Sequence, residues 1–193
     1  MKGGSGAVKG ADGYDHIGLL DCAGGIMAQD YEMFELQDPH RLIRHEFATD
    51  SAGGGRWRGG LGVETEFVIE GEKVTGITFG DGIEEEARAF GLFGGTKGSA
   101  NRITLTYPGG TVRSPKAKEI VRGIPRGAGF FEHAGGGGGY GDPAMRPAEL
   151  VVRDVKNGVV SVEAARKIYR VVIDPGTLEL DGKATESLRR AEP

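Results

Sequence analysis

The chain has 193 residues, which is enough for a single domain with its own hydrophobic core. Its formal net charge of −4 and its lack of a basic block argue against nucleic acid as a partner. No apolar run reaches the length of a membrane span, and the N-terminus has no apolar signal core. The single cysteine, Cys22, excludes a disulfide within the chain, and we interpret it as a buried structural thiol. We therefore expect a cytoplasmic protein with no membrane partner.

Glycine is the outlier in the composition. It accounts for 36 of the 193 residues, against a usual share of about 7%. The glycines gather in four clusters, at 53–62, 91–98, 109–110 and 135–141. Normal apolar segments separate these clusters, so the pattern predicts tight connections within a folded protein rather than low-complexity disorder. Because only 38% of the residues are hydrophobic, we expect a partner to complete part of the surface.

The first part of the chain gives weak signals. Residues 1–13 contain nothing that nucleates a helix or a strand, which predicts either a flexible arm or an irregular segment held by a neighbour. Over 14–37, hydrophobic and acidic residues alternate imperfectly, and we expect an extended segment there. After a turn at Asp38-Pro39, residues 42–48 predict a strand that leads into the first glycine cluster.

The middle of the chain predicts a series of strands. Apolar side chains at alternate positions over 61–69 indicate a half-buried strand. A turn at Gly71-Glu72 then predicts a hairpin whose second strand is 73–79. The acidic run at 84–86 indicates a solvated loop or the start of a helix. Further strands are predicted at 101–107, 119–122 and 129–133.

The last part of the chain has helical spacing instead. Pro147 marks the start of one helix and Asn157-Gly158 its end, and Ser161 is a good N-cap for a second helix over 162–169. Short extended pieces at 171–173 and 178–180 precede a charged helix over 183–191. The predicted class is α+β, with a β-rich body and glycine-rich loops followed by a small helical tail. The predicted divisions are an arm over 1–13, a β-rich domain over 14–143 and a helical segment over 144–193.

The stretch Asp50–Gly62 holds the chain's only tryptophan. Trp57 lies between Arg56 and Arg58, and a large apolar anchor beside two cations is enriched at interface centres. These three residues are therefore candidates for contact with a substrate or a partner. The alternative is a tight connection ahead of a strand, with Trp57 capping the core.

Two short polar residues open the same stretch. Asp50 and Ser51 could orient a polar substrate together with the neighbouring arginines. They could equally accept hydrogen bonds from backbone N–H groups in the turn, as such side chains commonly do. Both interpretations stay open at the level of sequence.

The last glycine run has candidates on both sides. His133 ends a predicted strand just before it and is the most site-like histidine, although it could simply be hydrogen-bonded in the core. Asp142 follows the run and is a further candidate for substrate or interface contact. No Lys-Ser/Thr pair follows 135–139, so a phosphate-binding loop is disfavoured. Such a run would instead let the chain pass close beneath another chain or a substrate. Spacing alone supports no Ser/His/Asp or Cys/His arrangement and no metal-binding histidine pair.

Several blocks of the sequence resemble one family. The stretch Asp-Ser-Ala-Gly-Gly-Gly-Arg-Trp-Arg-Gly-Gly-Leu-Gly (50–62) carries the clearest resemblance. Gly-Leu-Phe-Gly-Gly (91–95), the run 136–143 and the segment 154–166 follow in the family's order. The family is hydantoinase B/oxoprolinase, which includes the equivalent subunits of acetone and acetophenone carboxylases.

The resemblance covers only the C-terminal part of typical family members. Gly-Gly-Ser-Gly-Ala (3–7) resembles a block that normally lies in mid-chain. The N-terminal part, where the carboxylase relatives hold a metal, has no counterpart here. The resemblance therefore implies a split subunit whose missing half is a separate polypeptide.

The resemblance also implies a reaction. A partner resembling hydantoinase A would bind ATP and phosphorylate a carbonyl or enolate oxygen, and a divalent metal (Mg, or else Mn or Zn) is expected in the partner subunits. No cofactor or metal is expected in this chain, which alone is expected to be inactive. The complex would hydrolyse a cyclic amide such as hydantoin or 5-oxoproline. The alternatives are an acetone- or acetophenone-type ketone carboxylase that also uses bicarbonate, and a structural or assembly subunit without catalytic residues.

Overall fold

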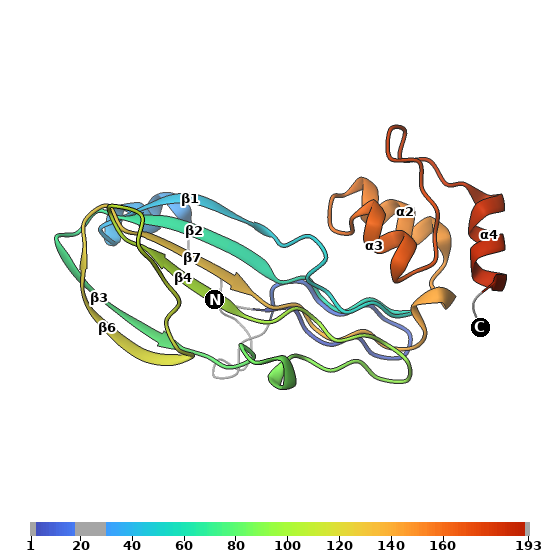
Figure 1. Ribbon diagram of the computed structural model, residues 1–193, viewed down its shortest axis with the longest axis horizontal. Coiled ribbons are helices and arrows are strands. Elements are labelled where there is room, and N and C mark those ends of the chain that lie inside the picture. The colour runs from blue at the N-terminus through green and yellow to red at the C-terminus, as the bar shows by residue number, and fades with distance from the viewer. Residues whose placement is uncertain (1–2, 18–29, 192–193) are drawn as a thin grey trace.

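The computed structural model describes residues 3–17 and 30–191, so the interpretation of Cys22 lies outside the described residues. The elements in chain order are α1 (Tyr31–Gln37), β1 (His40–Phe47), β2 (Val63–Ile69), β3 (Lys73–Phe79), η1 (Glu85–Ala87), β4 (Arg102–Thr106), β5 (Val112–Arg113), β6 (Lys118–Pro125), β7 (Gly129–Ala134), η2 (Pro143–Met145), α2 (Ala148–Lys156), α3 (Val162–Lys167) and α4 (Gly182–Ala191). The sheets and α1 lie at one end of the long axis, α2, α3 and α4 lie at the other, and irregular extended segments lie between them (Figure 1). The predicted α+β class is confirmed, with most strands where alternation placed them.

The strands form two sheets. Five antiparallel strands are ordered β1-β2-β7-β4-β5, and β3 pairs with β6 in a separate two-stranded sheet. The buried residues between them are Ile69, Leu105, Val121, Ile124 and Ala128. Phe67 and Phe130 stack beside this core, with ring centroids 4.7 Å apart. Side chains that alternate along each strand thus supply the usual core of a layered β structure.

The predicted hairpin is wrong in its pairing, although both strands exist. β2 lies between β1 and β7, which occupy both of its edges, so no edge is free for β3. The chain instead crosses to the second sheet, where Val74 packs against the shared core and Ile77 lies opposite Ile120 of β6. The alternation predicted the strands correctly but could not identify their neighbours.

The predicted extended segment over 14–37 is wrong at its end, because 31–37 form α1. The Asp30 side chain accepts a hydrogen bond from the Glu32 N–H and caps the helix. Phe34 packs edge-on against Phe67, with ring centroids 5.7 Å apart. The Asp30 cap and the contact between Phe34 and Phe67 therefore favour a helix over the extended conformation that the weak hydrophobic alternation predicted.

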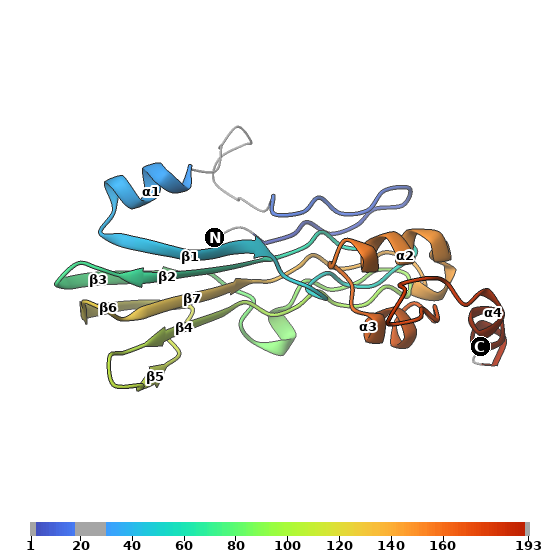
Figure 2. The same ribbon diagram turned by 90° about the horizontal axis from the view of Figure 1, so that it is seen from above.

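Three of the four glycine clusters do not form isolated turns, and only 109–110 is a simple exposed turn. We call the four segments 3–7, 53–62, 91–98 and 135–141 the glycine bundle, because they run side by side and bond to one another through their backbones (Figure 2). The last segment is central. Gly137 donates to the Gly60 carbonyl over 2.9 Å and accepts from the Gly53 N–H over 2.8 Å. The next glycine, Gly138, accepts from the Ala7 N–H over 2.9 Å.

Close packing explains why the central segment consists of glycine. A Cβ atom on Gly137 would lie 1.8 Å from the Ser5 carbonyl oxygen. A Cβ on Gly138 would lie 1.9 Å from the carbonyl oxygen of Phe90. The contacted atoms belong to backbone and cannot swing away, so any side chain would separate the segments. The sequence predicted close passage beneath another chain or a substrate, and the structure shows that the neighbour is the same chain.

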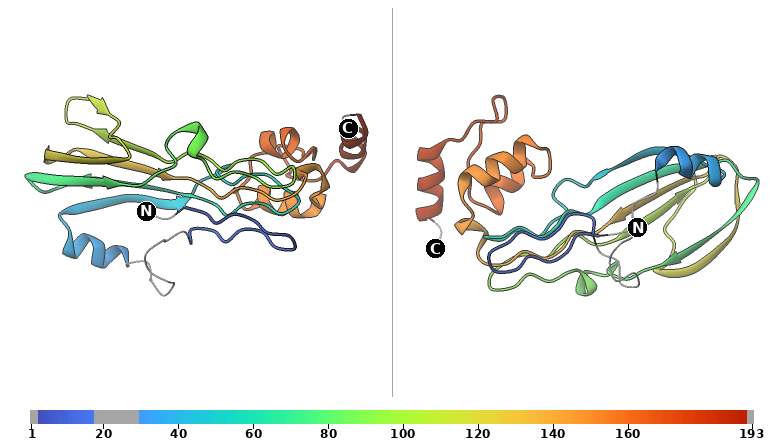
Figure 3. Two further views of the ribbon diagram at one scale, coloured as in Figure 1. Left: turned by 90° about the horizontal axis from the view of Figure 1, so that it is seen from below. Right: turned by 180° about the vertical axis from the view of Figure 1, so that it is seen from behind.

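The bundle also holds the N-terminal segment in place. Over residues 3–13, the predicted arm is extended and bonded to the rest of its own chain (Figure 3). The Gly4 N–H donates to the Gly135 carbonyl over 3.1 Å, and the Gly13 N–H donates to the Arg58 carbonyl over 2.8 Å. The N-terminal segment is therefore held by other parts of its own chain.

The helices have a small core of their own. It contains Val151, Val155, Val160, Ala165, Tyr169, Val171 and Ile173. The predicted caps are confirmed, since Pro147 precedes α2 and the Ser161 hydroxyl accepts from the Ala164 N–H at the start of α3. No helix within the described residues is both long and apolar enough to cross a bilayer.

Candidate functional site

Asp50 and Ser51 bond to backbone groups. The Asp50 carboxylate accepts from the Ser161 N–H over 2.8 Å, and Asp50 itself has a φ of 58°. The buried Ser51 hydroxyl donates to the Ala48 carbonyl over 2.6 Å and accepts from the Gly62 N–H over 2.9 Å. These contacts fix the turn before β2 and attach it to the start of α3. They match the second of the two interpretations, and a substrate role for either residue stays a prediction.

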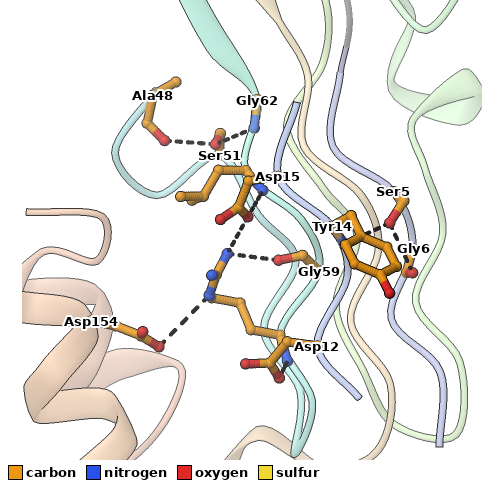
Figure 4. A network of polar contacts seen from close by, with 12 residues as sticks. Ser5, Gly6, Asp12, Tyr14, Asp15, Ala48, Ser51, Gly59, Gly62 and Asp154 are labelled. Carbon is orange, nitrogen blue, oxygen red and sulfur yellow. Dashed lines mark hydrogen bonds and ion pairs between the residues drawn. The ribbon is translucent and has the colours of Figure 1, made fainter. Parts of the chain in front are cut away.

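Arg58 is buried and makes ion pairs with distant segments, and its partners Asp15 and Asp154 are labelled in Figure 4. Its guanidinium lies 3.4 Å from Asp15 and 3.6 Å from Asp154 of α2. Arg146, which has no exposed surface, joins the same group. Its guanidinium makes two bonds of 2.8 Å to the Asp12 carboxylate and one of 2.9 Å to Asp154. The N-terminal segment, the bundle and the helices therefore share one charge network, in which both arginines and Asp154 are buried and Asp12 and Asp15 are partly exposed.

The charges in this network hold one another in their ionised forms. Burial opposes the charge on Arg146, but Asp12 and Asp154 outweigh it and raise the pKa of the guanidinium. Burial would raise the pKa of Asp12, but its bonds to Arg146 and Arg58 lower it overall. Burial also raises the pKa of the neighbouring Tyr169 hydroxyl to about 12. The network therefore connects segments of chain, and a contact of Arg58 with a substrate or a partner stays a prediction.

Arg56 and Trp57 lie on the surface of the bundle. We call Arg56, Trp57, Phe93 and Tyr140 the aromatic cluster. The Trp57 ring meets Tyr140 edge-on with centroids 5.6 Å apart, and the Arg56 guanidinium lies 5.0 Å from the Trp57 centroid. Phe93 lies 4.9 Å from Tyr140, and is 75% exposed. Trp57 is half-buried and belongs to neither hydrophobic core, so it does not cap the core as the alternative interpretation had it.

The backbone holds one member of the cluster in an unfavourable conformation. Phe93 has a φ of 51°, which costs a bulky residue free energy. That conformation presents a large apolar ring to solvent rather than burying it. Aromatic rings and an arginine gathered at one surface are typical of the anchors of protein interfaces.

His133 belongs to a group of three side chains where β7 meets the bundle. Its Nε2 lies 2.9 Å from the Ser99 hydroxyl, and its Nδ1 lies 3.1 Å from the Glu64 carboxylate. We call these the Ser99–His133–Glu64 group. Ser99 and His133 line a cavity of about 550 Å³. The prediction that His133 is site-like thus gains two partners that spacing could not reveal.

Asp142 serves as a local cap. Its carboxylate accepts from the Ala144 N–H over 2.8 Å at the start of η2. The side chain is exposed, and a contact with substrate or partner stays a prediction. Within residues 3–17 and 30–191, no three histidine, cysteine, aspartate or glutamate side chains converge as metal ligands would.

Comparison with known proteins gives a consistent relationship. The family described as hydantoinase B/oxoprolinase matches residues 1–143. The chain is 35% identical over 196 residues to the caprolactamase subunit beta of Pseudomonas jessenii, which covers 97% of this chain and 32% of the relative. It is 27% identical over 224 residues to the acetophenone carboxylase delta subunit of Aromatoleum aromaticum, covering 98% and 32%. The chain therefore spans about a third of the length of these curated relatives.

Solved structures agree with this relationship. The crystal structure of the ATP-dependent caprolactamase from Pseudomonas jessenii matches with a TM-score of 0.80 at 32% identity, covering 98% of this chain and 33% of that one. Nucleotide-free acetone carboxylase shares the fold, with a TM-score of 0.83 at 22% identity, covering 98% and 29%. Because the family match covers most of its length, the chain belongs to the hydantoinase B/oxoprolinase family.

Proposed function

We propose that this chain forms the C-terminal part of a hydantoinase B-type subunit in an ATP-dependent complex that hydrolyses a cyclic amide. The observation that carries this proposal is the 35% identity with caprolactamase subunit beta over 97% of the chain. The acetophenone carboxylase subunit, at 27%, is less similar, so ring opening is proposed in preference to ketone carboxylation.

The proposal assigns separate tasks to separate parts of the complex. A hydantoinase A-like subunit binds ATP, with its divalent metal, and transfers phosphate to the carbonyl oxygen of the substrate. The phosphorylated oxygen then becomes a leaving group, and the reactive intermediate has to be protected from bulk water until it is attacked in place. Closely packed segments such as the glycine bundle suit a rigid wall of that chamber, because they contain few side chains that could move.

The aromatic cluster is the surface that we assign to the rest of the hydantoinase B-type module. The curated relatives carry about twice as much additional chain as this segment contains, and that chain must contact it somewhere. A half-buried Trp57 with a stacked arginine, next to an exposed Phe93, is the kind of anchor that such contacts use. The occupant we propose is therefore the remaining part of the same module.

Reconstitution tests the reaction. The chain is co-purified with the ATP-binding subunit and the rest of the module, then supplied with ATP, Mg²⁺ and either caprolactam, hydantoin or 5-oxoproline. We expect ring-opened product and ADP to form together. Bicarbonate-dependent carboxylation of acetone or acetophenone instead, or turnover of the lactam without ATP, would contradict the proposal.

Replacing the anchor tests the interface. Trp57→Ala is expected to weaken association with the rest of the module about 30-fold, as truncating an interface hot spot by about 2 kcal/mol does. The control is Val112→Ala, an exposed apolar residue in β5 at the end of the molecule opposite to α2, α3 and α4 (Figure 2). Affinity is measured by calorimetry or by retention on an immobilised partner. Equal affinity for the Trp57 variant and the wild type would remove the aromatic cluster from the interface.

A further inference from the structure

We propose that Ser99 is a nucleophile activated by His133 and that Glu64 positions the histidine, so that this chain contains an acyl-transfer site of its own. The three side chains come from three separate segments, namely β2, β7 and the residues just after the bundle's third segment. This inference does not depend on the proposed lactam hydrolysis.

The hydrogen bonds determine where the protons lie. A carboxylate can only accept, so in the neutral imidazole the Nδ1 of His133 carries the proton and donates to Glu64 over 3.1 Å. Nε2 must then accept, and its partner over 2.9 Å is the Ser99 hydroxyl. The hydroxyl proton therefore points at the base that would remove it. This is the arrangement of nucleophile, base and orienting group that characterises serine hydrolases.

Each member of the group is held in place by further contacts. Glu64 and His133 lie directly opposite each other on paired strands, and the second oxygen of Glu64 lies 3.0 Å from the Arg44 guanidinium. The Ser99 N–H donates to the Ser51 carbonyl over 2.8 Å. The Ser99 hydroxyl oxygen accepts from the Gly136 N–H over 3.2 Å. That last bond stabilises negative charge on the oxygen as its proton leaves.

The group faces a space in which a substrate could lie. The cavity of about 550 Å³ is of the size that small-molecule sites usually have. Ile83 and Ile103 give it an apolar lining, and the Arg102 side chain supplies a positive charge. Arg102 lies opposite His133 in the strand register, and its guanidinium lies 5.4 Å from the ring centroid of Phe131, two residues before His133 in β7. The matching substrate is a small acyl compound, an ester or an activated amide, that carries a carboxylate.

The chemistry balances with water as the only co-reactant. The Ser99 oxygen forms a bond to the acyl carbon while the bond to the leaving group breaks. The hydroxyl proton passes to Nε2 of His133 and then to the leaving group. A water molecule next attacks the acyl carbon, gives one proton to Nε2, and releases the acid as the Ser99 oxygen recovers that proton. Glu64 does not exchange a proton and stabilises the imidazolium that forms twice.

A fluorophosphonate tests the nucleophile directly, since an activated serine displaces its fluoride and keeps the phosphonyl group. The full chain, together with any subunits that co-purify, is treated with an alkyl fluorophosphonate, and the modified residue is located by mass spectrometry. We expect label on Ser99. Ser99→Ala should abolish it, and His133→Gln should slow it by about 100-fold or more. The control Ser187→Ala, on the exposed face of α4, should label like the wild type.

The positioning residue gives a second readout. In Glu64→Gln the imidazolium loses its carboxylate partner, so labelling should slow about 10-fold or more and its half-maximal rate should move to lower pH. Wild-type protein that takes no label at Ser99, or takes it no faster than surface serines do, would overturn the proposal. So would a Glu64→Gln variant with an unchanged rate and pH profile. Either result would leave the group as a structural tie between sheet and bundle.

Discussion

The glycine bundle and the two sheets pack neighbouring extended segments together by opposite means. In the sheets, a strand uses its edges for hydrogen bonds and its two faces for side chains, and the core is filled by residues such as Leu105. In the bundle, the central segment has other segments around it, so hydrogen bonds and close backbone contacts replace the side chains. The sheets are therefore stabilised by buried apolar side chains, whereas the bundle packs closely because its glycines have no Cβ atom.

The largest effect should come from adding one carbon to the bundle. In Gly137→Ala the new Cβ would lie 1.8 Å from the Ser5 carbonyl oxygen. We expect a loss beyond the usual cost of about 1–3 kcal/mol for overpacking, because backbone on both sides has to move. Urea unfolding followed by circular dichroism measures it. Gly80→Ala is the control, because a Cβ there meets nothing within 4 Å and should change stability by about 0.5 kcal/mol or less.

Breaking the charge network should come next. Arg146→Met keeps a side chain of similar length but leaves the buried Asp154 and the partly buried Asp12 without their shared cation. We expect a loss of about 3–5 kcal/mol in the free energy of unfolding. The comparison variant is Lys167→Met, whose ion pair with Glu163 is exposed and should contribute little to stability. Similar losses for the two variants would show that the network does not connect the bundle to the helices.

Removing carbon from the sheet core gives the counterpart of the glycine test. Leu105 is 2% exposed, and Leu105→Ala should cost about 2–5 kcal/mol through the lost burial and the cavity left behind. Amide exchange of β4 and β7 should quicken in this variant. If exchange of 135–141 quickened equally, the bundle and the sheets would unfold as one unit and the contrast between them would be weaker.

The alternating and capped parts of the chain were predictable from sequence. Apolar patterns predicted most of the strands, although not β5, and Pro147 and Ser161 predicted where α2 and α3 begin. These signals are local, because they depend on residues within one element. The same signals could not identify pairing, which is why β3 was assigned to the wrong neighbour. They also missed α1, where a cap and one contact between Phe34 and Phe67 decide the conformation.

The bundle and the Ser99–His133–Glu64 group were not predictable for a different reason. Glycine has no side chain and therefore contributes to no hydrophobic pattern. A glycine segment that is packed on several sides has the same sequence signal as a series of turns. Ser99 lies 34 residues from His133, and Glu64 lies 69 residues from it. Only the pairing of β2 with β7 brings the last two together, and no local spacing encodes that.

The smallest effect should be a dependence on pH. The pKa of Asp12 is lowered in the folded chain, so its contribution to stability is complete above the unfolded value of about 3.9 and is lost as pH falls through the folded value. Asp12→Asn should therefore be less stable than the wild type by about 1.5–3 kcal/mol at pH 7. The difference should shrink below pH 4, which urea midpoints at pH 7 and pH 3 would show. A constant gap would mean that Asp12 acts through packing and not through charge.

Hydrogen exchange at the central glycine segment is the most direct test of the glycine bundle. The Gly137 N–H donates to Gly60 and the Gly139 N–H donates to Thr96, over 2.9 and 3.0 Å. Amides over 135–141 should exchange as slowly as those of β2 and β7, with or without partner subunits. Exchange as fast as that of the exposed turn at Gly109-Gly110 would contradict it, because the segments could not then be bonded to one another.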